Sequence, residues 1–188
     1  MFKSYKTDGI ILSRRNIGEA DKLITLYTRE FGKKTVIAKG IRRITSRRAP
    51  YLELFSYISL VLHRGKTLDI VTEVENRETF SLLRKKLERI AFVYIALELV
   101  NRLTAEGVEQ SVVFDRLYDF LRTLNHHTTQ RESAQAELTA FKQFLLINLG
   151  FIDEAITFSD EMLNDTVESI LERPLRSPAL LTNIQLGL

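Results

Sequence analysis

Hydrophobic and polar residues alternate along the first third of the chain, which is the period of half-buried β-strands. The alternation is clearest at residues 57–63, where Ile58, Leu60 and Leu62 fall on one face and Ser59 on the other. The next residues, Arg64–Lys66, have the composition of a hairpin loop. We expect five short strands, at residues 10–12, 22–28, 35–38, 57–63 and 68–74, with one long loop at residues 41–50.

From residue 79 the hydrophobic residues recur with a period of 3.6, which indicates helices. The first of these segments is apolar nearly all round, so we expect it to be the central buried helix. Gly150 is a suitable residue to end the third one. We expect helices at residues 80–97, 109–124 and 133–149, and shorter ones at 165–172 and after Pro178.

Together the two patterns predict an α+β fold. Five short strands with no helical segment between them are typical of a small closed barrel, and the OB-fold is the five-stranded version that holds nucleic acid on its face and loops. The period changes near Arg77. We therefore expect an OB-fold barrel at residues 1–77 followed by an all-α helical domain at residues 78–188.

The positive charge is concentrated in the expected barrel. Residues 1–80 carry a net charge of +7, whereas residues 81–188 carry −4. Such a block of one sign repels itself unless solvent or a polyanion takes up its field, so DNA bound through its phosphates is the leading partner. A solvated surface, or a non-catalytic adaptor whose basic loop meets an acidic protein, is the alternative. The block contains no acid and seven cations: Lys33, Lys34, Lys39, Arg42, Arg43, Arg47 and Arg48.

Aromatic residues near this block offer surfaces on which unpaired bases can stack. Each of them, taken singly, is more often part of a core than a stacking platform. The candidates are Tyr27, Phe31, Tyr51 and Tyr57.

No catalytic or metal-binding pattern accompanies the charge. The chain has no Cys, His63 is isolated, and His126 and His127 are adjacent, a spacing that does not chelate one ion on a helix. Two carboxylates in Gly18–Asp21 fit a structural turn better than a magnesium site. We expect no enzyme activity, no metal and no cofactor, and a phosphoryl-transfer enzyme is disfavoured.

Membrane insertion and secretion are not expected either. The longest apolar run, Ile90–Leu97, is too short to span a bilayer, and residues 1–6 lack the apolar core of a signal peptide. A cytoplasmic location is therefore expected.

Several short segments, in this order, resemble the N-terminal part of the bacterial recombination mediator family RecO. The resemblance implies an OB-fold, a helical domain and a non-enzymatic role in DNA repair. It further implies binding of single- and double-stranded DNA, strand annealing, contact with the single-strand-binding protein, and loading of the recombinase RecA together with RecR, on the nucleoid. The segments are Asp8–Leu12, Gly18–Asp21, Leu26–Lys33, Ala38–Arg43 and Ser46–Arg47, with weaker similarity at Tyr94–Leu99, Phe141–Phe151 and Pro174–Ser177.

The DNA-binding positions of the family carry over to Lys39, Arg42, Arg43 and Arg47, whereas Lys33, Lys34 and Arg48 are added here from charge alone. The chain also departs from the family. Many relatives carry a four-Cys zinc-binding insert after the third helix, and this chain has no Cys and few residues between Phe151 and Pro174. We expect the insert to be absent.

The acidic helical half is expected to dock a protein as well. The resemblance favours a groove for the short, acidic, apolar-ended tail of the single-strand-binding protein, and such a ligand needs an apolar pocket edged by cations. Pure core packing is the alternative. Glu98, an acid within the buried helix, is expected to be paired. The cations available to edge a pocket are Arg102, Arg116, Arg122 and Lys142.

Overall fold

The computed structural model describes residues 3–126, 130–156, 158–172 and 174–175. Its contacts divide the chain into two compact units. The barrel unit comprises Met1–Thr79 and Ala105–Asp115, and the helical unit comprises Phe80–Thr104 and Arg116–Leu188. The domains expected at residues 1–77 and 78–188 remain a prediction.

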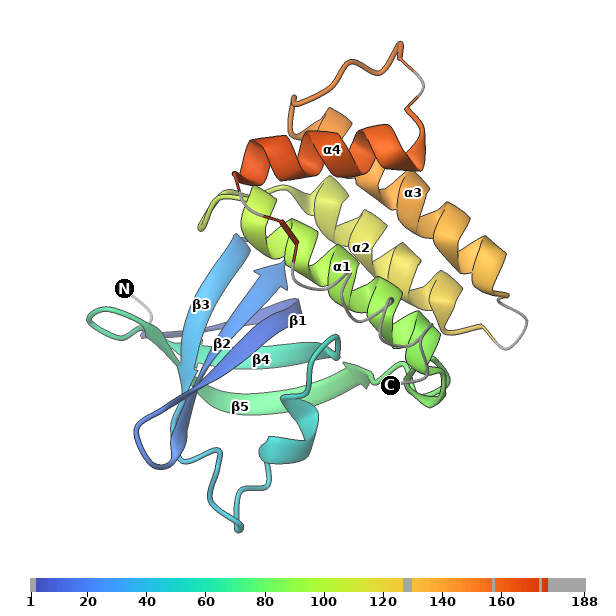
Figure 1. Ribbon diagram of the computed structural model, residues 1–188. Helices are drawn as coiled ribbons and strands as arrows, with labels where there is room; N and C mark the ends of the chain where they lie inside the picture. Colours follow the sequence, from blue (N-terminus) through green and yellow to red (C-terminus); the bar gives the residue numbers. More distant parts are fainter. Residues whose placement is uncertain (1–2, 127–129, 157, 173, 176–188) are drawn as a thin grey trace. The chain divides into compact units, whose positions relative to one another are not determined.

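All five expected strands are present and close a barrel (Figure 1). The order around the barrel is β1-β2-β3-β5-β4, with β3 and β5 parallel and the other pairs antiparallel. The predicted fold, an OB-type barrel followed by helices, is confirmed. The strands are β1 (Ser4–Ile17), β2 (Asp21–Thr28), β3 (Gly32–Ala38), β4 (Tyr57–His63) and β5 (Asp69–Glu78).

Strand β1 is much longer than expected because it pairs with two neighbours. Its first half, Ser4–Ile10, pairs with β4, and its second half, Gly9–Ile17, pairs with β2. The two ends of β1 are polar and are held in the sheet by main-chain hydrogen bonds. The hydrophobic pattern does not reveal such bonds, so it predicted only the apolar middle of the strand. The apolar side chains that alternate along the strands fill the barrel core, among them Ile11, Ile24, Leu26, Val36, Ile58, Leu60 and Leu62.

The helical unit is built from a 3-10 turn, η2 (Leu83–Lys85), and helices α1 (Leu87–Leu103), α3 (Arg131–Asn148) and α4 (Asp160–Leu171), with the part of α2 (Ser111–Leu124) that follows Asp115. Helix α1 begins later than expected. The left-handed backbone of Phe80 (φ 50°) and the η2 turn interrupt the helical path before it.

Helix α1 is buried along most of its length, as its apolar composition predicts. It carries one buried cation, Arg89, which is only 8% exposed. The Arg89 guanidinium donates to the carbonyl oxygens of Leu124 (3.0 Å) and His126 (2.7 Å), so it satisfies carbonyls at the end of α2. The expectation that Glu98 is paired is confirmed, because Arg102 lies 3.2 Å from its carboxylate.

The helix ends follow local capping chemistry. Gly150 adopts φ 77° after α3, and its N–H donates to the Ile147 carbonyl (2.9 Å), so the predicted stop is confirmed. Helix α4 begins at Asp160 rather than at residue 165 because Ser159 caps it, accepting from the Met162 N–H (3.3 Å). The helix expected after Pro178 lies outside the described residues.

Candidate nucleic-acid interface

The connection between β3 and β4 is the basic loop, residues 39–56, and it is tied to the β1–β2 turn. The Gly40 N–H donates to the Asp21 carboxylate (2.7 Å), and the Arg42 N–H donates to the Ala20 carbonyl (2.9 Å). The Arg42 guanidinium also donates to the Gly18 carbonyl (3.1 Å). The Gly18–Asp21 turn therefore anchors the loop, which agrees with its structural interpretation.

Arg48 fastens the far side of the basic loop. Its guanidinium donates to the carbonyl oxygens of Val71 (2.5 Å) in β5 and Lys39 (2.8 Å) at the end of β3. A guanidinium that satisfies two main-chain carbonyls in this way is occupied by the fold. Arg48 is thus a structural residue in this arrangement, and the prediction that it contacts DNA remains untested.

Four cations of the basic loop project into solvent. Lys39, Arg42, Arg43 and Arg47 are all exposed. Within the described part of the chain none of the four forms an ion pair with an acid, so their charges are available to an anionic ligand. These are the four positions that the family resemblance implies.

Two further cations, Arg15 and Lys22, lie on the strands on either side of the Gly18–Asp21 turn that anchors this loop. Lys22 pairs in register with Ala38, the last residue of β3, so it lies beside the start of the loop. Arg15 is exposed on β1 and pairs with Leu23, the residue that follows Lys22 in β2. These two residues could have been found from the pairing register of β1, β2 and β3, because pairing places residues that are distant in sequence next to each other.

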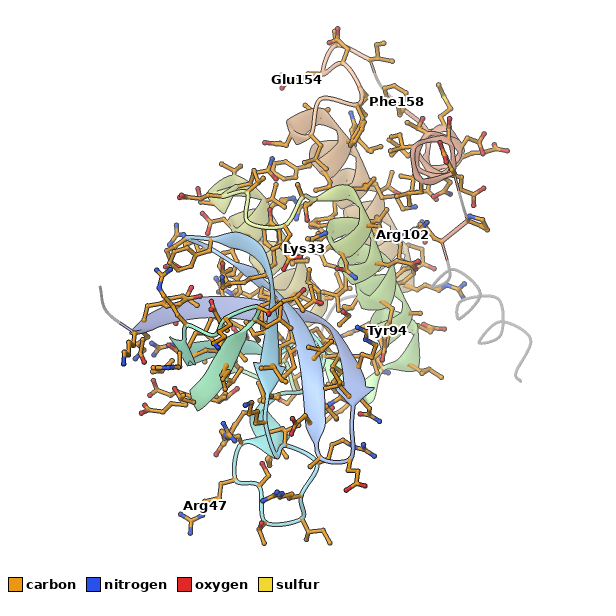
Figure 2. The ribbon with its side chains drawn as sticks, turned by 90° about the vertical axis from the view of Figure 1, so that its left-hand side faces the viewer. Lys33, Arg47, Tyr94, Arg102, Glu154 and Phe158 are labelled. Atoms are coloured by element: carbon orange, nitrogen blue, oxygen red, sulfur yellow. The ribbon has the colours of Figure 1, made fainter. Side chains whose placement is uncertain are left out.

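Lys33 and Lys34 do not belong to this cluster. They lie at the opposite end of β3, a strand of seven residues, and Figure 2 shows Lys33 and Arg47 at different ends of the barrel unit. The Lys33 carbonyl accepts from the Gly107 N–H (2.8 Å), and burial lowers the pKa of the Lys33 amine although the Glu106 carboxylate opposes this. Lys33 and Lys34 therefore lie on the strand that leads to the basic loop, apart from Arg47, and their contact with DNA remains a prediction.

Lys34 is held in a network across three strands. Its ammonium lies 2.9 Å from the Asp69 carboxylate, which also accepts a hydrogen bond from the Tyr5 hydroxyl. Burial raises the pKa of Asp69, but the hydrogen bonds from Tyr5 and Lys34 outweigh it and leave that pKa below its ordinary value. Burial likewise lowers the pKa of Lys34, yet its bonds to Asp69 and Tyr5 leave it raised. Lys34 therefore stabilises the barrel.

The aromatic candidates are mostly occupied by packing. Tyr27 is fully buried, which agrees with core packing, the commoner alternative for each of these aromatics, and burial raises its pKa to about 12. Phe31 packs edge-on against Tyr5 (centroids 5.2 Å apart), and Tyr57 does so against Phe114 (5.8 Å). Tyr51, in the short 3-10 helix η1 (Ala49–Tyr51) of the basic loop, is 41% exposed, and Phe31 is 38% exposed, so both remain stacking candidates.

Three of the four candidate cations of the helical unit, Arg102, Arg116 and Lys142, are paired with acids. Arg116 lies 2.6 Å from Glu137, and Arg102 bonds both Glu98 and the Pro174 carbonyl. Arg122 stacks over the Tyr118 ring (5.7 Å). Lys142 is the most buried of the four candidate cations of the helical unit.

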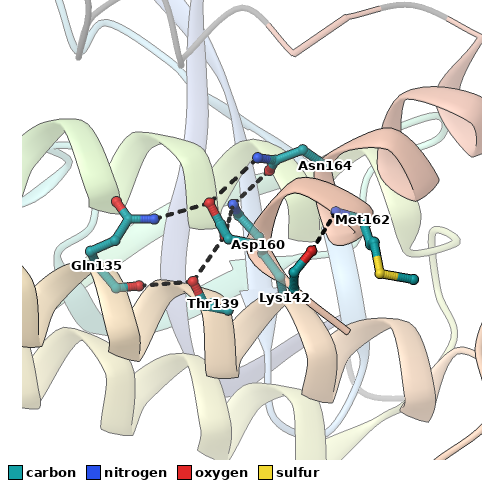
Figure 3. A network of polar contacts seen from close by, with 7 residues as sticks. Gln135, Thr139, Lys142, Asp160, Met162 and Asn164 are labelled. Carbon is teal, nitrogen blue, oxygen red and sulfur yellow. Dashed lines mark hydrogen bonds and ion pairs between the residues drawn. The ribbon is translucent and has the colours of Figure 1, made fainter. Parts of the chain in front are cut away.

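Lys142 is the centre of a polar network between α3 and α4 (Figure 3). Its side chain is only 4% exposed and its ammonium contacts the Asp160 carboxylate (2.8 Å) and the Asn164 side-chain oxygen (2.7 Å). Thr139 also donates to Asp160 (2.9 Å). Lys142, Asp160 and Asn164 line a cavity of about 220 Å³ together with apolar residues such as Ile95 and Leu138.

Two family models match the chain. One is described as "Recombination protein O N terminal" and covers residues 1–80, and the other as "Recombination protein O C terminal" and covers residues 84–152. The chain belongs to the RecO family. Among its relatives, DNA repair protein RecO of Pelotomaculum thermopropionicum is 43% identical over 122 residues, which are 65% of this chain and 48% of the relative.

Other RecO proteins cover more of the chain. DNA repair protein RecO of a Roseiflexus species is 40% identical over 149 residues, which are 78% of this chain and 50% of the relative. That of Symbiobacterium thermophilum is 37% identical over 147 residues, 78% of this chain and 57% of the relative. The chain thus spans about half the length of the curated relatives it matches.

The RecO match ends at residue 152, before α4. The expectation that this chain skips a zinc-binding insert and resumes the family pattern at Pro174 therefore remains a prediction. In the described part of the chain no three His, Asp or Glu side chains gather where they could hold a metal ion. No described helix is both long enough and apolar enough to cross a membrane.

Proposed function

We propose that this RecO-family chain is a non-catalytic DNA-binding protein of DNA repair and recombination, and that it holds DNA on the exposed cations of the basic loop. The observation that carries the proposal is the placement of Lys39, Arg42, Arg43 and Arg47 on one anchored loop without acidic partners among the described residues. Family membership supports the same ligand independently.

The arrangement favours recognition of the phosphate backbone over recognition of sequence. Lys and Arg neutralise phosphates wherever they occur along a strand, whereas reading of bases requires groups matched to base edges. The basic loop presents exposed Lys or Arg side chains at four positions. Arg48 and the Gly18–Asp21 turn hold the loop in place, so binding costs little ordering of the backbone.

Binding of both single- and double-stranded DNA and annealing of complementary strands follow from the same surface. Two strands repel one another through their phosphates, and a cationic surface that screens this repulsion favours their pairing. We extend the proposal to cooperation with RecR in loading RecA onto strands covered by the single-strand-binding protein, on the cytoplasmic nucleoid. Family membership supports this extension.

The helical unit is proposed to receive the acidic tail of the single-strand-binding protein. Because Arg102, Arg116 and Lys142 already bond Glu98, Glu137 and Asp160, an acidic tail must displace an existing partner to use any of them. Arg122 is the fourth candidate, and it stacks on Tyr118. Titration of a labelled tail peptide against the full chain and against an Arg122→Glu variant tests this part, because micromolar binding lost on charge reversal supports it and absent binding to the full chain refutes it.

The salt dependence of DNA binding tests the main proposal. With about four phosphate contacts on a single strand, log K should fall against log salt with a slope near −3, at roughly 0.7 per contact. Fluorescence anisotropy of two labelled oligonucleotides of unrelated sequence should give the same slope and similar affinity. A slope near zero, or tighter binding to an acidic protein surface than to DNA, would favour the adaptor function instead.

A further inference from the structure

A large apolar side chain stands at the tip of the basic loop. Ile44 is fully exposed, with a relative exposure of 105%, the highest of the large apolar residues in the described part of the chain. Single exposed apolar residues are common on protein surfaces and need no explanation by themselves. The position of Ile44 is what distinguishes it, since Arg42, Arg43 and Arg47 are its exposed neighbours.

The local backbone holds Ile44 outward. The Arg43 N–H donates to the Gly40 carbonyl (3.2 Å), and the Ser46 N–H donates to the Arg43 carbonyl (2.9 Å), so two successive turns build the tip. Ile44 occupies a central position of the second turn. Gly, Pro, Asn, Asp and Ser are the residues that turn geometry favours at such positions, and a β-branched apolar residue adds nothing to the turn itself.

The chemistry of the tip indicates what lies against it. The surrounding cations select an anionic surface, while Ile44 needs an apolar one in order to leave water. Nucleic acid presents both within a few ångströms, because the faces of its bases lie between charged phosphates. Branched and unbranched apolar side chains are known to enter between base steps in this way and partly unstack them.

We propose that Ile44 inserts between adjacent bases of the bound DNA while the neighbouring cations hold the flanking phosphates. The proposal rests on the proposed function, since it concerns how the same loop meets its ligand. It gives the loop a second action beyond charge neutralisation. Each binding event locally unstacks the strand, which leaves base edges open for pairing with a complementary strand.

Two substitutions separate insertion from simple charge attraction. Ile44→Thr keeps the branched shape and removes the apolar character, and Ile44→Ala removes the reach of the side chain. Because neither alters a charge, the slope of log K against log salt should stay that of the parent chain. Affinity should fall about tenfold with Ile44→Ala, the effect of losing one well-buried apolar contact. Val112→Ala, at a 56% exposed site of the barrel unit away from the loop, is the matched control and should change affinity less than twofold.

The insertion itself is measured with oligonucleotides that contain 2-aminopurine, which fluoresces more strongly when it is unstacked. At saturation the parent chain and Val112→Ala should raise the fluorescence, and Ile44→Ala and Ile44→Thr should not. The chain contains no Trp, so Ile44→Trp places a single indole at the tip, and we expect DNA to quench its emission. A Val112→Trp indole should be unaffected.

One outcome is that the parent chain binds DNA while Ile44→Ala shows the same affinity and the same rise in 2-aminopurine fluorescence. That result would overturn the insertion and leave the proposed function intact. Absence of DNA binding by the parent chain overturns both. Loss of fluorescence change with a preserved salt slope supports the insertion. Melting temperatures equal to that of the parent chain exclude misfolding as the cause, and equality is expected for a fully exposed site.

Discussion

The exposed cations of the basic loop and the buried cation Lys142 of the helical unit differ in what already surrounds them. Lys39, Arg43 and Arg47 face solvent, whereas Lys142 is 4% exposed and bonds both Asp160 and Asn164. The charges of the first group are available to a ligand, whereas the charge of Lys142 is already balanced by Asp160 within the fold. Cationic residues in a sequence therefore predict a binding surface only where the fold leaves them exposed and without acidic partners.

The largest expected effect is on the stability of the helical unit. Lys142→Met keeps the aliphatic stem but leaves the Asp160 carboxylate without its cation, so we expect the free energy of unfolding to fall by about 3 kcal/mol. DNA affinity measured well below the melting temperature should be unchanged. Urea denaturation gives the first quantity and fluorescence anisotropy the second.

The control for this substitution is an exposed ion pair of the same unit. Arg131 and Glu88 lie 3.8 Å apart with 42% and 49% of their side chains exposed, and Arg131→Met should cost less than about 1 kcal/mol. Equal costs for Lys142→Met and Arg131→Met would contradict the structural role of the Lys142 network.

The next largest effect is expected on DNA affinity. Arg42→Ala with Arg43→Ala should weaken binding roughly 30-fold at moderate salt and flatten the salt slope by about 1.4, which corresponds to two lost phosphate contacts. Lys85→Ala with Lys86→Ala removes the same charge from two adjacent exposed positions of the helical unit. That control should retain the parent slope, and a similar loss in both double variants would mean that net charge alone governs binding.

A smaller effect is expected at the Lys34–Asp69 ion pair of the barrel unit. The pKa of Asp69 is lowered in the folded state, so its contribution to stability is present above the ordinary pKa and is lost as pH falls through the folded value. Asp69→Asn should therefore cost about 1–2 kcal/mol at pH 7 and progressively less below about pH 4. Urea midpoints at both pH values test this, and a gap that widens in acid would contradict the sign.

The smallest effect is expected from metal removal. The chain has no Cys to supply sulfur ligands, and two of its three His residues are adjacent, so few side chains suited to zinc are present. Melting curves with and without a chelator should superimpose. A fall of many degrees on chelation would show a structural metal.

The sequence predicted the barrel more completely than the site. Alternation located β4 at Tyr57–His63, and the charge block located the basic loop, because both signals are local. The burial of Tyr27 and the use of Lys34 and Arg48 within the fold depend on partners distant in the chain, namely Asp69 in β5 for Lys34 and the Val71 carbonyl for Arg48. Such partners become visible only when strand order and register are known.

The same reason explains the two cations that were missed. Strand register places Lys22 opposite Ala38, the residue before the loop, and places Arg15 opposite Leu23, the residue after Lys22. The first residues of α1 and α4 differ from those expected for another reason. The positive φ of Phe80 and the Ser159 cap act on a few residues at a helix end, where the hydrophobic period is uninformative.

The most direct test of the difference between exposed and engaged cations is lysine acetylation of the full chain, followed by mass spectrometry, with and without single-stranded DNA. Lys39 should react rapidly and be protected by DNA. The exposed Lys85 and Lys86 of the helical unit should react rapidly and remain unprotected, and Lys34 and Lys142 should react slowly in both conditions. Lys39 reacting equally with and without saturating DNA, or Lys142 reacting as fast as Lys39, would contradict the account.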